Sequence, residues 1–317
     1  MDFKLRNTPA VSVVLPVFNG GPYLEEAILS IRNQSFKDFE FIIINDGSTD
    51  RSLDLIKVHA SEDSRIVLID RENRGLVNSL NEGVNIARGE LIARMDADDV
   101  ALPDRLSKQY EFMSLNAGVV AAGTGYLLID EDGDPIRIFR HSTEDSALQQ
   151  QGLQRFTPIC HPTAIFKKKE FLAVGGYREV SMLAEDLDLW LRMGEQGKLG
   201  NLSDVLVKYR QHSASLSESK QLQQLAVMHR VALEAHKRRG LSVDGSLSQP
   251  QMPWRSTGSA DDNYSQLIKY GWWAWSDGYT STAQKYAARA VVSNLLNRES
   301  WVLLYCAWLR KNKFRFE

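Results

Sequence analysis

Carboxylates gather at the end of one short apolar segment, Glu90–Asp99, whose sequence is Glu-Leu-Ile-Ala-Arg-Met-Asp-Ala-Asp-Asp. Asp96, Asp98 and Asp99 would repel one another at neutral pH unless a cation shares them. Oxygen-only ligands suit Mg²⁺ or Mn²⁺ rather than zinc, and such an ion keeps open positions for phosphate oxygens. The cluster therefore predicts a divalent metal site. The alternative is a turn in which Asp98 or Asp99 caps a helix that opens at Pro103.

The N-terminal half alternates apolar runs with segments of helical spacing, which predicts an α/β fold with a mostly parallel sheet flanked by helices. The predicted strands are Val11–Val17, Phe39–Ile44, Arg65–Ile69 and Leu91–Met95, and the helices between them are Tyr23–Asn33, Ser52–Ala60 and Leu76–Ala87. In open sheets of this kind, ligands bind beyond the carboxyl ends of the strands. Three polar loops meet there, which favours the metal over the helix cap: Pro16–Gly21, Asn45–Asp50 and Asp96–Asp99.

The second half of the chain has a different organisation. A helix at Pro103–Leu115 precedes a hairpin of Val119–Ile129 and Pro135–Phe139, and Ile159–Phe166 is predicted as a strand with a kink at its proline. We expect a catalytic domain over residues 1–218 and a helical C-terminal extension over 219–317, with a loop at 241–262. The expected closing helices are Asn263–Ser276, Tyr279–Ser293 and Arg298–Lys313.

Composition sets broad limits on the class of protein. The 317 residues are 43% apolar and 25% charged, which is enough for about two domains with their own cores. With 38 basic and 40 acidic residues the net charge is −2, which argues against nucleic acid as a partner. Cys160 and Cys306 are far apart, and we identify no secretory leader and no apolar run of about 18 residues. These features favour the cytoplasm.

A second pair of carboxylates, Glu185 and Asp186, begins a segment of helical spacing. Asp186 belongs neither to the apolar stripe of this segment nor to its polar face, and a lone carboxylate there costs stability unless it is hydrogen-bonded or faces a cleft. It is therefore a candidate general base that deprotonates a hydroxyl. The alternative is an acid favoured in the first turn by the helix dipole. The stripe comprises Leu183, Leu187, Trp190 and Leu191, and the polar face Glu185, Asp188 and Arg192.

Five motifs stand in the order and spacing of family-2 glycosyltransferases with the GT-A fold, which the chain resembles over roughly residues 10 to 215. The resemblance implies an inverting enzyme of the type that builds bacterial surface polysaccharides. It implies a UDP-sugar that donates a hexose or an N-acetylhexosamine, a Mn²⁺ or Mg²⁺ cofactor, and a glycan or lipid-linked saccharide as acceptor. The family's Glu-Asp motif points to Asp186, with Glu185 beside it, as the catalytic position. The motifs are Val11–Asn19, Phe41–Asp50, Asn73–Leu76, Asp96–Asp99 and Glu185–Trp190.

Ligand chemistry suggests how the first two loops would bind the nucleotide. Asp46 follows a strand and is suited to accept the N3–H of uracil, while its alternative role is an Asx turn with Gly47. Both roles are compatible. The first loop contains Pro16, Val17 and Asn19, and its main-chain groups and amide are placed to meet the base.

The loop around Gly75 and the acid cluster supply the other expected contacts with the donor. An arginine in this loop is suited to bidentate contact with a diphosphate. The alternative is that the charged residues of the loop are simply exposed to solvent. Arg94 either joins the donor or pairs with the aspartates and holds them in place. The expected contacts are Asn73, Arg74, Gly75, Arg94, Asp96 and Ala97.

Two histidines and one tryptophan complete the candidate site. His212 follows a predicted strand and is a candidate to complete the metal or diphosphate site, against an ordinary surface or capping histidine. His161 and Trp190 are expected beside the sugar or the acceptor. For His161 the alternative is a hydrogen-bonded histidine in the core.

Two other functions remain open from the sequence. A sugar nucleotidyltransferase has a similar sheet, but Pro16–Gly21 lacks the glycine-rich, arginine-containing phosphate loop of such enzymes. A catalytically weak nucleotide-sugar-binding or scaffold protein would keep the fold but lack the acidic residues of the site. Asp96, Asp98 and Asp186 are all present, which favours the enzyme.

Aromatic residues are dense in the C-terminal helices, and Arg310–Arg315 places four cations after them. Most of these rings are expected to pack between the helices. Aromatic residues beside cations also suit the interface of an anionic membrane, so peripheral contact with its inner face is a second expectation. The aromatics are Trp272, Trp273, Trp275, Trp301, Tyr305 and Trp308.

Overall fold

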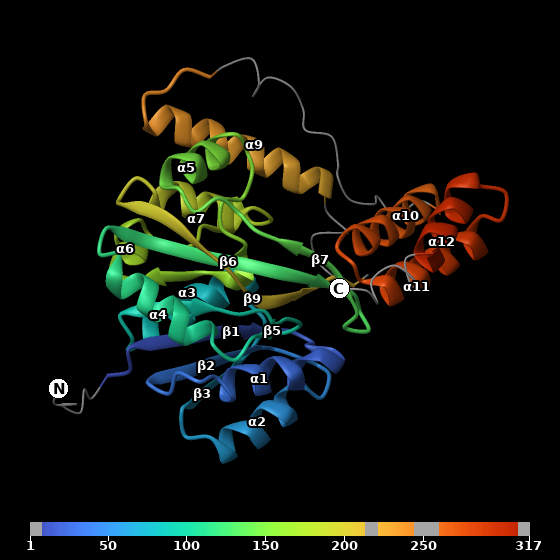
Figure 1. The fold of residues 1–317 in the computed structure, drawn as a ribbon. Helices are drawn as coiled ribbons and strands as arrows, with labels where there is room; N and C mark the ends of the chain where they lie inside the picture. The colour runs from blue at the N-terminus through green and yellow to red at the C-terminus, as the bar shows by residue number, and fades with distance from the viewer. Residues whose placement is uncertain (1–7, 213–220, 244–259, 310–317) are drawn as a thin grey trace. The chain divides into compact units, whose positions relative to one another are not determined.

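The fold comes from a computed structural model, which describes residues 8–212, 221–243 and 260–309 (Figure 1). Most of the predicted loop 241–262 and the cationic segment Arg310–Arg315 lie outside these residues. The described chain forms two compact units that alternate along the sequence. The first draws on Met1–Tyr126, Arg140–Tyr209 and Ala226–Gln249, and the second on Leu127–Phe139, Arg210–Leu225 and Pro250–Glu317. The predicted domain boundary at residue 218 stays a prediction.

The first unit begins with parallel strands in the order β3-β2-β1-β4. Strands β1 and β2 are buried along their whole length, because helices cover both faces of the sheet. Val11 of β1 pairs with Phe39 of β2 on one side and with Leu91 of β4 on the other. The strands are β1 (Val11–Val17), β2 (Phe39–Asp46), β3 (Ile66–Arg71) and β4 (Leu91–Arg94), and the helices are η1 (Gly21–Tyr23), α1 (Leu24–Arg32), α2 (Ser52–Glu62) and α3 (Leu76–Ile86).

Alternate residues of β1 point into two separate hydrophobic cores. Val13 and Leu15 join a core with the apolar residues of α1 and with Leu106 of α4 (Arg105–Leu115). Val14 joins a core on the other face with α3 and with Trp190 of α7 (Glu185–Met193). The core on this second face therefore packs α7 against the sheet.

The second part of the sheet is antiparallel, so the sheet as a whole is mixed. β4 pairs with β8, and β8 pairs with β6, both antiparallel. The α/β fold flanked by helices is confirmed, and the parallel pairs, β1 with β2, β1 with β4 and β2 with β3, lie in its N-terminal part. The other strands are β5 (Val100–Ala101), β6 (Val119–Ile129), β7 (Pro135–Phe139), β8 (Ile165–Lys167) and β9 (Lys198–Arg210).

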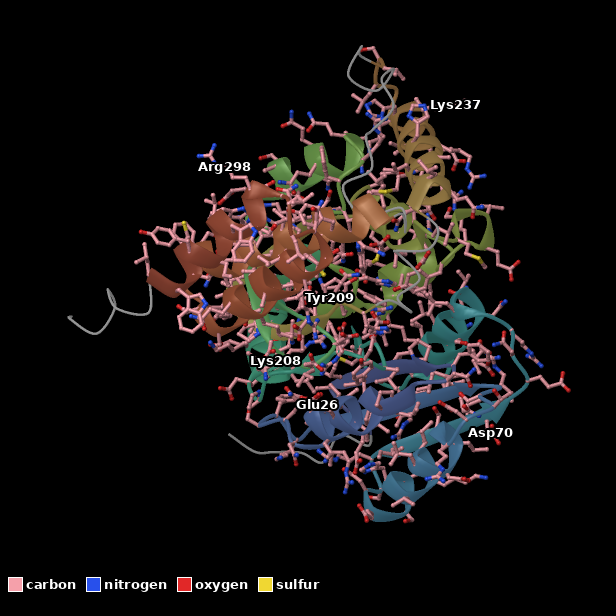
Figure 2. The ribbon with its side chains drawn as sticks, turned by 90° about the vertical axis from the view of Figure 1, so that its right-hand side faces the viewer. Glu26, Asp70, Lys208, Tyr209, Lys237 and Arg298 are labelled. Carbon is pink, nitrogen blue, oxygen red and sulfur yellow. The ribbon has the colours of Figure 1, made fainter. Side chains whose placement is uncertain are left out.

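Several elements differ from the sequence predictions. The kinked strand predicted over Ile159–Phe166 is a short 3-10 helix, η2 (His161–Thr163), followed by β8. Helix α4 starts two residues later than Pro103, and β5 precedes it. A shallow hollow of about 270 Å³ lies beside β5. Its lining includes Glu26 and Lys208, whose side chains are labelled in Figure 2. The remaining helices are α5 (Asp145–Leu153), α6 (Lys168–Ala173), η3 (Glu179–Ser181) and α9 (Gln221–Arg238).

The second unit is built on three helices, α10 (Ala260–Ser276), α11 (Thr280–Ser293) and α12 (Arg298–Leu309). They pack closely: a Cβ atom added at Gly271 would lie 2.4 Å from the Leu303 side chain. Lys285 of α11 places its ammonium 2.7 Å from a carboxylate oxygen of each aspartate in the turn between β6 and β7. These aspartates are Asp130, Asp132 and Asp134.

The C-terminal aromatics divide into two groups. The tryptophans of α10 pack on other rings, with Trp272 and Trp275 edge to face at 5.5 Å and Trp273 beside Tyr270 at 5.9 Å. On α12 the rings face outward, and Trp301, Tyr305 and Trp308 are 49%, 66% and 59% exposed. The described helices include none that is long and apolar enough to cross a membrane.

Candidate active site

Three aspartates converge immediately after β4. One carboxylate oxygen from each of Asp96, Asp98 and Asp99 lies within 4.8 Å of the others. Three carboxylate oxygens are a donor set that fits Mg²⁺ or Mn²⁺. Helix α4 begins after Asp104, so the alternative in which Asp98 or Asp99 caps that helix is wrong. We call these three aspartates the acid cluster.

Arg94 lies behind the acid cluster as the last residue of β4. Its buried guanidinium forms an ion pair with Asp96, which is the second of the two roles expected for it. Burial raises the pKa of Asp96 and the charge of Asp98 adds to this, while Arg94 opposes it. Arg94 therefore holds one carboxylate of the cluster in place.

Two further carboxylates begin α7. Leu183, two residues before this helix, has a φ of +80°, a conformation that a leucine rarely adopts, so the entry to the helix is strained. Burial raises the pKa of Glu185 to about 7, and the charge of Asp186 adds to this. Burial also raises the pKa of Asp186 to about 6, although the Leu187 amide donates a 2.7 Å hydrogen bond to its Oδ1.

The acid cluster and the start of α7 lie in one electrostatic neighbourhood. The charges of Arg94 and Asp96 both act on Asp186. Burial raises the pKa of the Cys160 thiol, and the charges of Asp99 and Asp186 also act on it. The fold therefore brings the predicted metal ligands and the predicted base together, with Cys160 beside them. No motif marks Cys160, so a lone cysteine of this kind cannot be identified from sequence alone.

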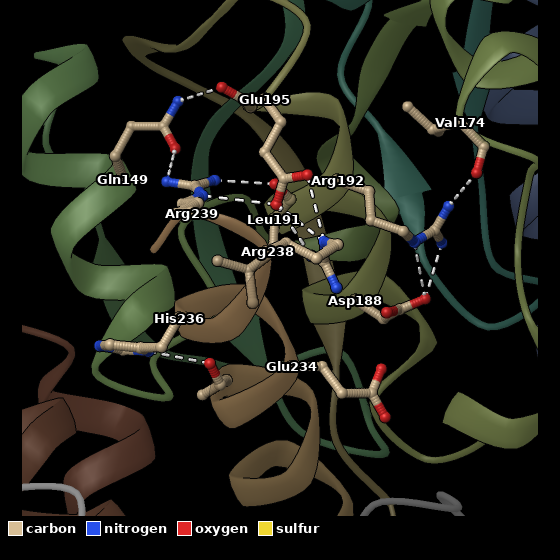
Figure 3. Close-up of polar contacts among 12 residues, drawn as sticks. Gln149, Val174, Asp188, Leu191, Arg192, Glu195, Glu234, His236, Arg238 and Arg239 are labelled. Carbon is tan, nitrogen blue, oxygen red and sulfur yellow. Dashed lines mark hydrogen bonds and ion pairs between the residues drawn. The ribbon is translucent and has the colours of Figure 1, made fainter. Parts of the chain in front are cut away.

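A buried ion network fixes the other side of α7 (Figure 3). Asp188 is fully buried and accepts hydrogen bonds from Arg192 at 2.6 Å and from Arg178 at 2.9 Å. Arg192 also donates to the carbonyl oxygen of Val174 at 2.7 Å. Two of the three residues of the predicted polar face, Asp188 and Arg192, thus belong to an internal network that holds α7, and neither Glu185 nor Asp186 takes part in these bonds.

Helix α9 extends this support. The carboxylate of Glu234 on this helix forms an ion pair with Arg178 at 2.8 Å. Arg238 forms another at 2.9 Å with Glu195, which lies just beyond the end of α7. Arg239 donates to the Leu191 carbonyl oxygen at 2.8 Å (Figure 3). Apolar residues of α9 also pack on α7, so its orientation is set by both kinds of contact. These residues are Val231 and Ala235, against Ala184, Leu187 and Leu191.

Asp46 anchors the loop around Gly75. Its two carboxylate oxygens accept the backbone N–H of Arg74 at 2.8 Å and of Gly75 at 2.9 Å, and Arg71 forms an ion pair with it. A Cβ atom at Gly47 would lie 2.6 Å from the Asn73 nitrogen, and only glycine easily adopts the φ of +73° found there. Asn73 and Arg74 are exposed beside this anchor. Arg71, by contrast, is engaged with Asp46 and with Glu82 at 2.6 Å.

The first loop is fastened to the second. Pro16 and Val17 are buried at the end of β1. Asn19 has a φ of +51°. Its side-chain oxygen accepts a hydrogen bond from the backbone N–H of Thr49 at 2.8 Å, and its own backbone N–H donates to the Ser48 hydroxyl at 3.0 Å. Its observed role is to join the two loops, and its contact with a base stays a prediction.

His161 and Trp190 belong to the core. Burial lowers the pKa of His161 well below its ordinary value, and its Nε2 lies 2.8 Å from the Tyr177 hydroxyl. These contacts agree with the alternative expectation for His161, a hydrogen-bonded histidine in the core. Trp190 is fully buried and donates its ring N–H to the Ile159 carbonyl oxygen at 3.1 Å. This corrects the expectation that Trp190 lies against a sugar, because its ring has no exposed surface.

His212 follows β9 in the second compact unit, whereas the acid cluster belongs to the first. Its assignment as a metal ligand stays a prediction. Ala97 is half-buried between the aspartates. From sequence, Asp99 is expected only as a member of the cluster or as a helix cap, and no role in the site is predicted for Arg105.

A mixed sheet flanked by helices, with further helices at the C-terminus, is the GT-A type of fold. The model of the family described as glycosyl transferase family 2 matches residues 12–173. The chain belongs to this family. It is 37% identical over 214 residues to the putative glycosyltransferase EpsE of Bacillus subtilis, a match that covers 66% of this chain and 76% of that one. It is 35% identical over 224 residues to the O-antigen biosynthesis glycosyltransferase WbnJ of Escherichia coli, covering 68% and 85%.

Solved structures agree on the fold. S. aureus TarS 1–349 in complex with UDP has a TM-score of 0.60 at 16% identity, over 97% of this chain and 93% of that chain. Mannosyltransferase PcManGT from Pyrobaculum calidifontis, in complex with GDP-Man and Mn²⁺, has a TM-score of 0.57 at 18% identity, over 98% and 88%. Against another TarS structure, the chain spans about half (53%) of that chain's length.

Proposed function

We propose that the protein is a metal-dependent, inverting glycosyltransferase. It transfers a hexose or an N-acetylhexosamine from a UDP-sugar to a glycan or lipid-linked saccharide during synthesis of a cell-surface polysaccharide. The observation that carries this proposal is the convergence of the acid cluster with Asp186, which lie within electrostatic reach of each other. The O-antigen role in the name of WbnJ and the UDP in the TarS complex support the polymer and the donor.

The acid cluster would hold the metal through Asp96 and Asp98, with Asp99 as a third oxygen donor. A bound divalent ion would offset the charge that builds on the departing diphosphate. Arg94 keeps Asp96 in position through its ion pair. The Mn²⁺ in the PcManGT complex supports this assignment.

Asp186 acts as the general base and takes the proton from the acceptor hydroxyl as that oxygen attacks the anomeric carbon. Because its raised pKa lies close to neutral pH, the carboxylate is a better proton acceptor than an exposed aspartate. A single displacement inverts the anomeric carbon. The buried network around Asp188 holds α7 so that Asp186 stays on the flank near the cluster.

The donor's uracil meets Asp46 and the first loop, and its diphosphate lies near Arg74 and the acid cluster. Asp46 accepts from Arg71 and from the Arg74 and Gly75 amides, which leaves one carboxylate lone pair for the N3–H of uracil, so the two roles are compatible.

We also propose that the second unit touches the cytoplasmic face of an anionic membrane. From Trp301 to Leu309, α12 carries no charged residue, and its outward face bears large apolar side chains. In the sequence, four cations follow directly in Arg310–Arg315. Aromatic side chains beside cations suit the interface of an anionic lipid surface, where a lipid-linked acceptor would be found. The exposed face comprises Trp301, Val302, Tyr305, Trp308 and Leu309.

The test is a panel of UDP-sugars with and without Mn²⁺, scored by release of free UDP. We expect slow hydrolysis of one donor, loss of it in EDTA and in Asp98→Ala, and recovery of the wild type on addition of Mn²⁺ or Mg²⁺. Circular dichroism checks that Asp98→Ala stays folded. Full activity in excess EDTA would contradict the metal assignment, and donor binding without UDP release would indicate a binding protein instead.

A further inference from the structure

Arg105, the first residue of α4, is a buried cation that donates its hydrogen bonds to neutral acceptors. None of its surface is exposed. Its Nη2 donates to the carbonyl oxygen of Arg94 at 2.6 Å and to that of Ala164 at 3.4 Å. Its Nη1 lies 3.1 Å from the Met95 sulfur, and its Nε donates to the Gln109 side-chain oxygen at 3.1 Å.

Such a residue is costly to bury. A guanidinium removed from water loses its favourable hydration, and apolar side chains commonly replace buried charges without loss of stability. Packing alone therefore does not account for an arginine at this position. Its planar fork of donors, which neither lysine nor an apolar side chain possesses, is the property that these four contacts use.

The contacts of Arg105 close the loop that carries the acid cluster. This loop leaves β4 after Arg94 and reaches α4 at Arg105, so the bond from Arg105 to the Arg94 carbonyl oxygen joins its two ends. The same side chain reaches Ala164, the residue before β8. Gln109 continues the link, because its Nε2 donates to the Thr163 carbonyl oxygen at 2.7 Å.

The charge of Arg105 also lies near the cluster. Asp99 and Asp96 both interact with it electrostatically. Together with Arg94, it places a second buried guanidinium behind three carboxylates that repel one another. Its position thus combines a geometric closure of the loop with a favourable charge.

We propose that Arg105 is a positioning residue of the metal site, whose fork joins the two ends of the acid-cluster loop and so holds the three carboxylates together before a cation binds. The inference rests on the proposed metal dependence. It assigns Arg105 no contact with the metal or the donor.

The test measures Mn²⁺ affinity by titration calorimetry in the absence of any sugar nucleotide. Arg105→Lys keeps the charge but cannot reach all four acceptors, and we expect it to bind Mn²⁺ about tenfold more weakly than the wild type. The matched control is Leu106→Ala, the next residue of the same helix and also fully buried. We expect this variant to lower the Tm while its Mn²⁺ affinity stays within about twofold of the wild type, since it removes apolar packing but none of the hydrogen bonds that Arg105 makes at the ends of the loop.

Wild-type Mn²⁺ affinity in a folded Arg105→Lys variant would overturn the inference, as would an equal loss of affinity in Leu106→Ala. If Arg105→Lys does not fold, Gln109→Leu replaces it: Arg105 remains, but its Nε acceptor and the link to Thr163 are lost. Weaker Mn²⁺ binding by Gln109→Leu supports the inference, and unchanged binding overturns it. A wild type that binds no Mn²⁺ would overturn the proposed metal dependence and this inference with it.

Discussion

Asp46 and Gly75 lie 29 positions apart in the chain and are joined by a 2.9 Å hydrogen bond from the Gly75 amide to the Asp46 carboxylate. The neighbouring amide of Arg74 binds the other carboxylate oxygen at 2.8 Å. The residue proposed to meet uracil thus also fixes the loop proposed to meet the diphosphate. Changes at Asp46 should disturb both ends of the nucleotide at once.

The first prediction concerns Asp46→Asn. An asparagine has one acceptor oxygen and presents an NH₂ group where the second backbone amide now donates. We expect UDP to bind about tenfold more weakly or worse, because a buried donor loses its partner. Titration calorimetry with UDP measures the effect, and Asp70→Asn, on the next strand, is the control that should bind UDP normally. Equal UDP affinity in Asp46→Asn and the wild type would refute the anchor.

The second prediction concerns the general base. Asp186→Asn keeps the size of the side chain and its ability to accept a hydrogen bond, but it cannot take the acceptor's proton. Transfer should fall by about 10² to 10⁴ while the donor still binds. Donor affinity and transfer rate are measured in the same preparation, with Glu185→Gln as the partner variant. An active Asp186→Asn beside an inactive Glu185→Gln would assign the base to Glu185.

The third prediction is the pH dependence of transfer. Burial raises the pKa of Glu185 to about 7 and that of Asp186 to about 6. Below these values the carboxylates carry protons, and a protonated Asp186 cannot act as a base. We therefore expect kcat/KM to fall as the pH drops through 7 to 6, and then by about tenfold for each further unit. A profile that stays flat down to pH 5 would contradict this role.

The fourth prediction concerns stability. The pKa of Asp186 is raised from an ordinary 3.8 to about 6 on folding, so the folded state binds more protons between these values and its stability decreases as the pH rises through them. Asp186→Asn has no charge to bury and should be more stable than the wild type at pH 7.5, by about 1–3 kcal/mol. The gain should disappear near pH 4.

Urea unfolding at pH 7.5 and pH 4.5, in metal-free buffer, measures this difference. Asp188→Asn is the contrasting variant, because its carboxylate is held by Arg178 and Arg192, and its loss should destabilise the protein. A less stable Asp186→Asn at pH 7.5 would show that the carboxylate contributes to folding instead of opposing it.

The fifth prediction concerns the outward face of α12. Serine at Trp301, Tyr305 and Trp308 together should abolish binding to anionic liposomes at low salt, and removal of residues 311–317 should weaken it, with UDP-sugar hydrolysis unchanged in both. Leu172→Ser, an exposed apolar residue of the first unit, is the control and should still float with the liposomes. Equal flotation of all variants, or none by the wild type, would contradict the membrane proposal.

Sequence patterns predicted the parallel strands well, because buried strands such as β1 and β2 are uninterrupted apolar runs. They did not predict the 3-10 helix at His161–Thr163. This short turn leads directly into β8, so in the sequence it looks like the first part of that strand. Helix α9 falls within the helical extension predicted over 219–317, but its packing on α7 does not follow from the sequence, because its apolar contacts with α7 come from few residues.

The candidate site shows the same limit. The sequence indicates the acid cluster and Asp186, because the residues of each motif are close together along the chain. Trp190 was placed beside a sugar because sequence cannot show that its ring is fully enclosed. Arg105 was missed for a related reason: a helical arginine is ordinarily exposed, and only the fold places carbonyl groups from β4 and the segment before β8 around it.

Lys285 and the three aspartates beside it bear on the stoichiometry of metal binding. Asp130, Asp132 and Asp134 converge as closely as the acid cluster does, but the ammonium of Lys285 already lies among them. A covalently attached cation cannot be dialysed away, and it supplies positive charge to this turn whatever the ionic composition of the buffer. The β6–β7 turn therefore keeps its shape in chelator, and among the residues that the structure describes the acid cluster is the carboxylate group left to bind Mn²⁺.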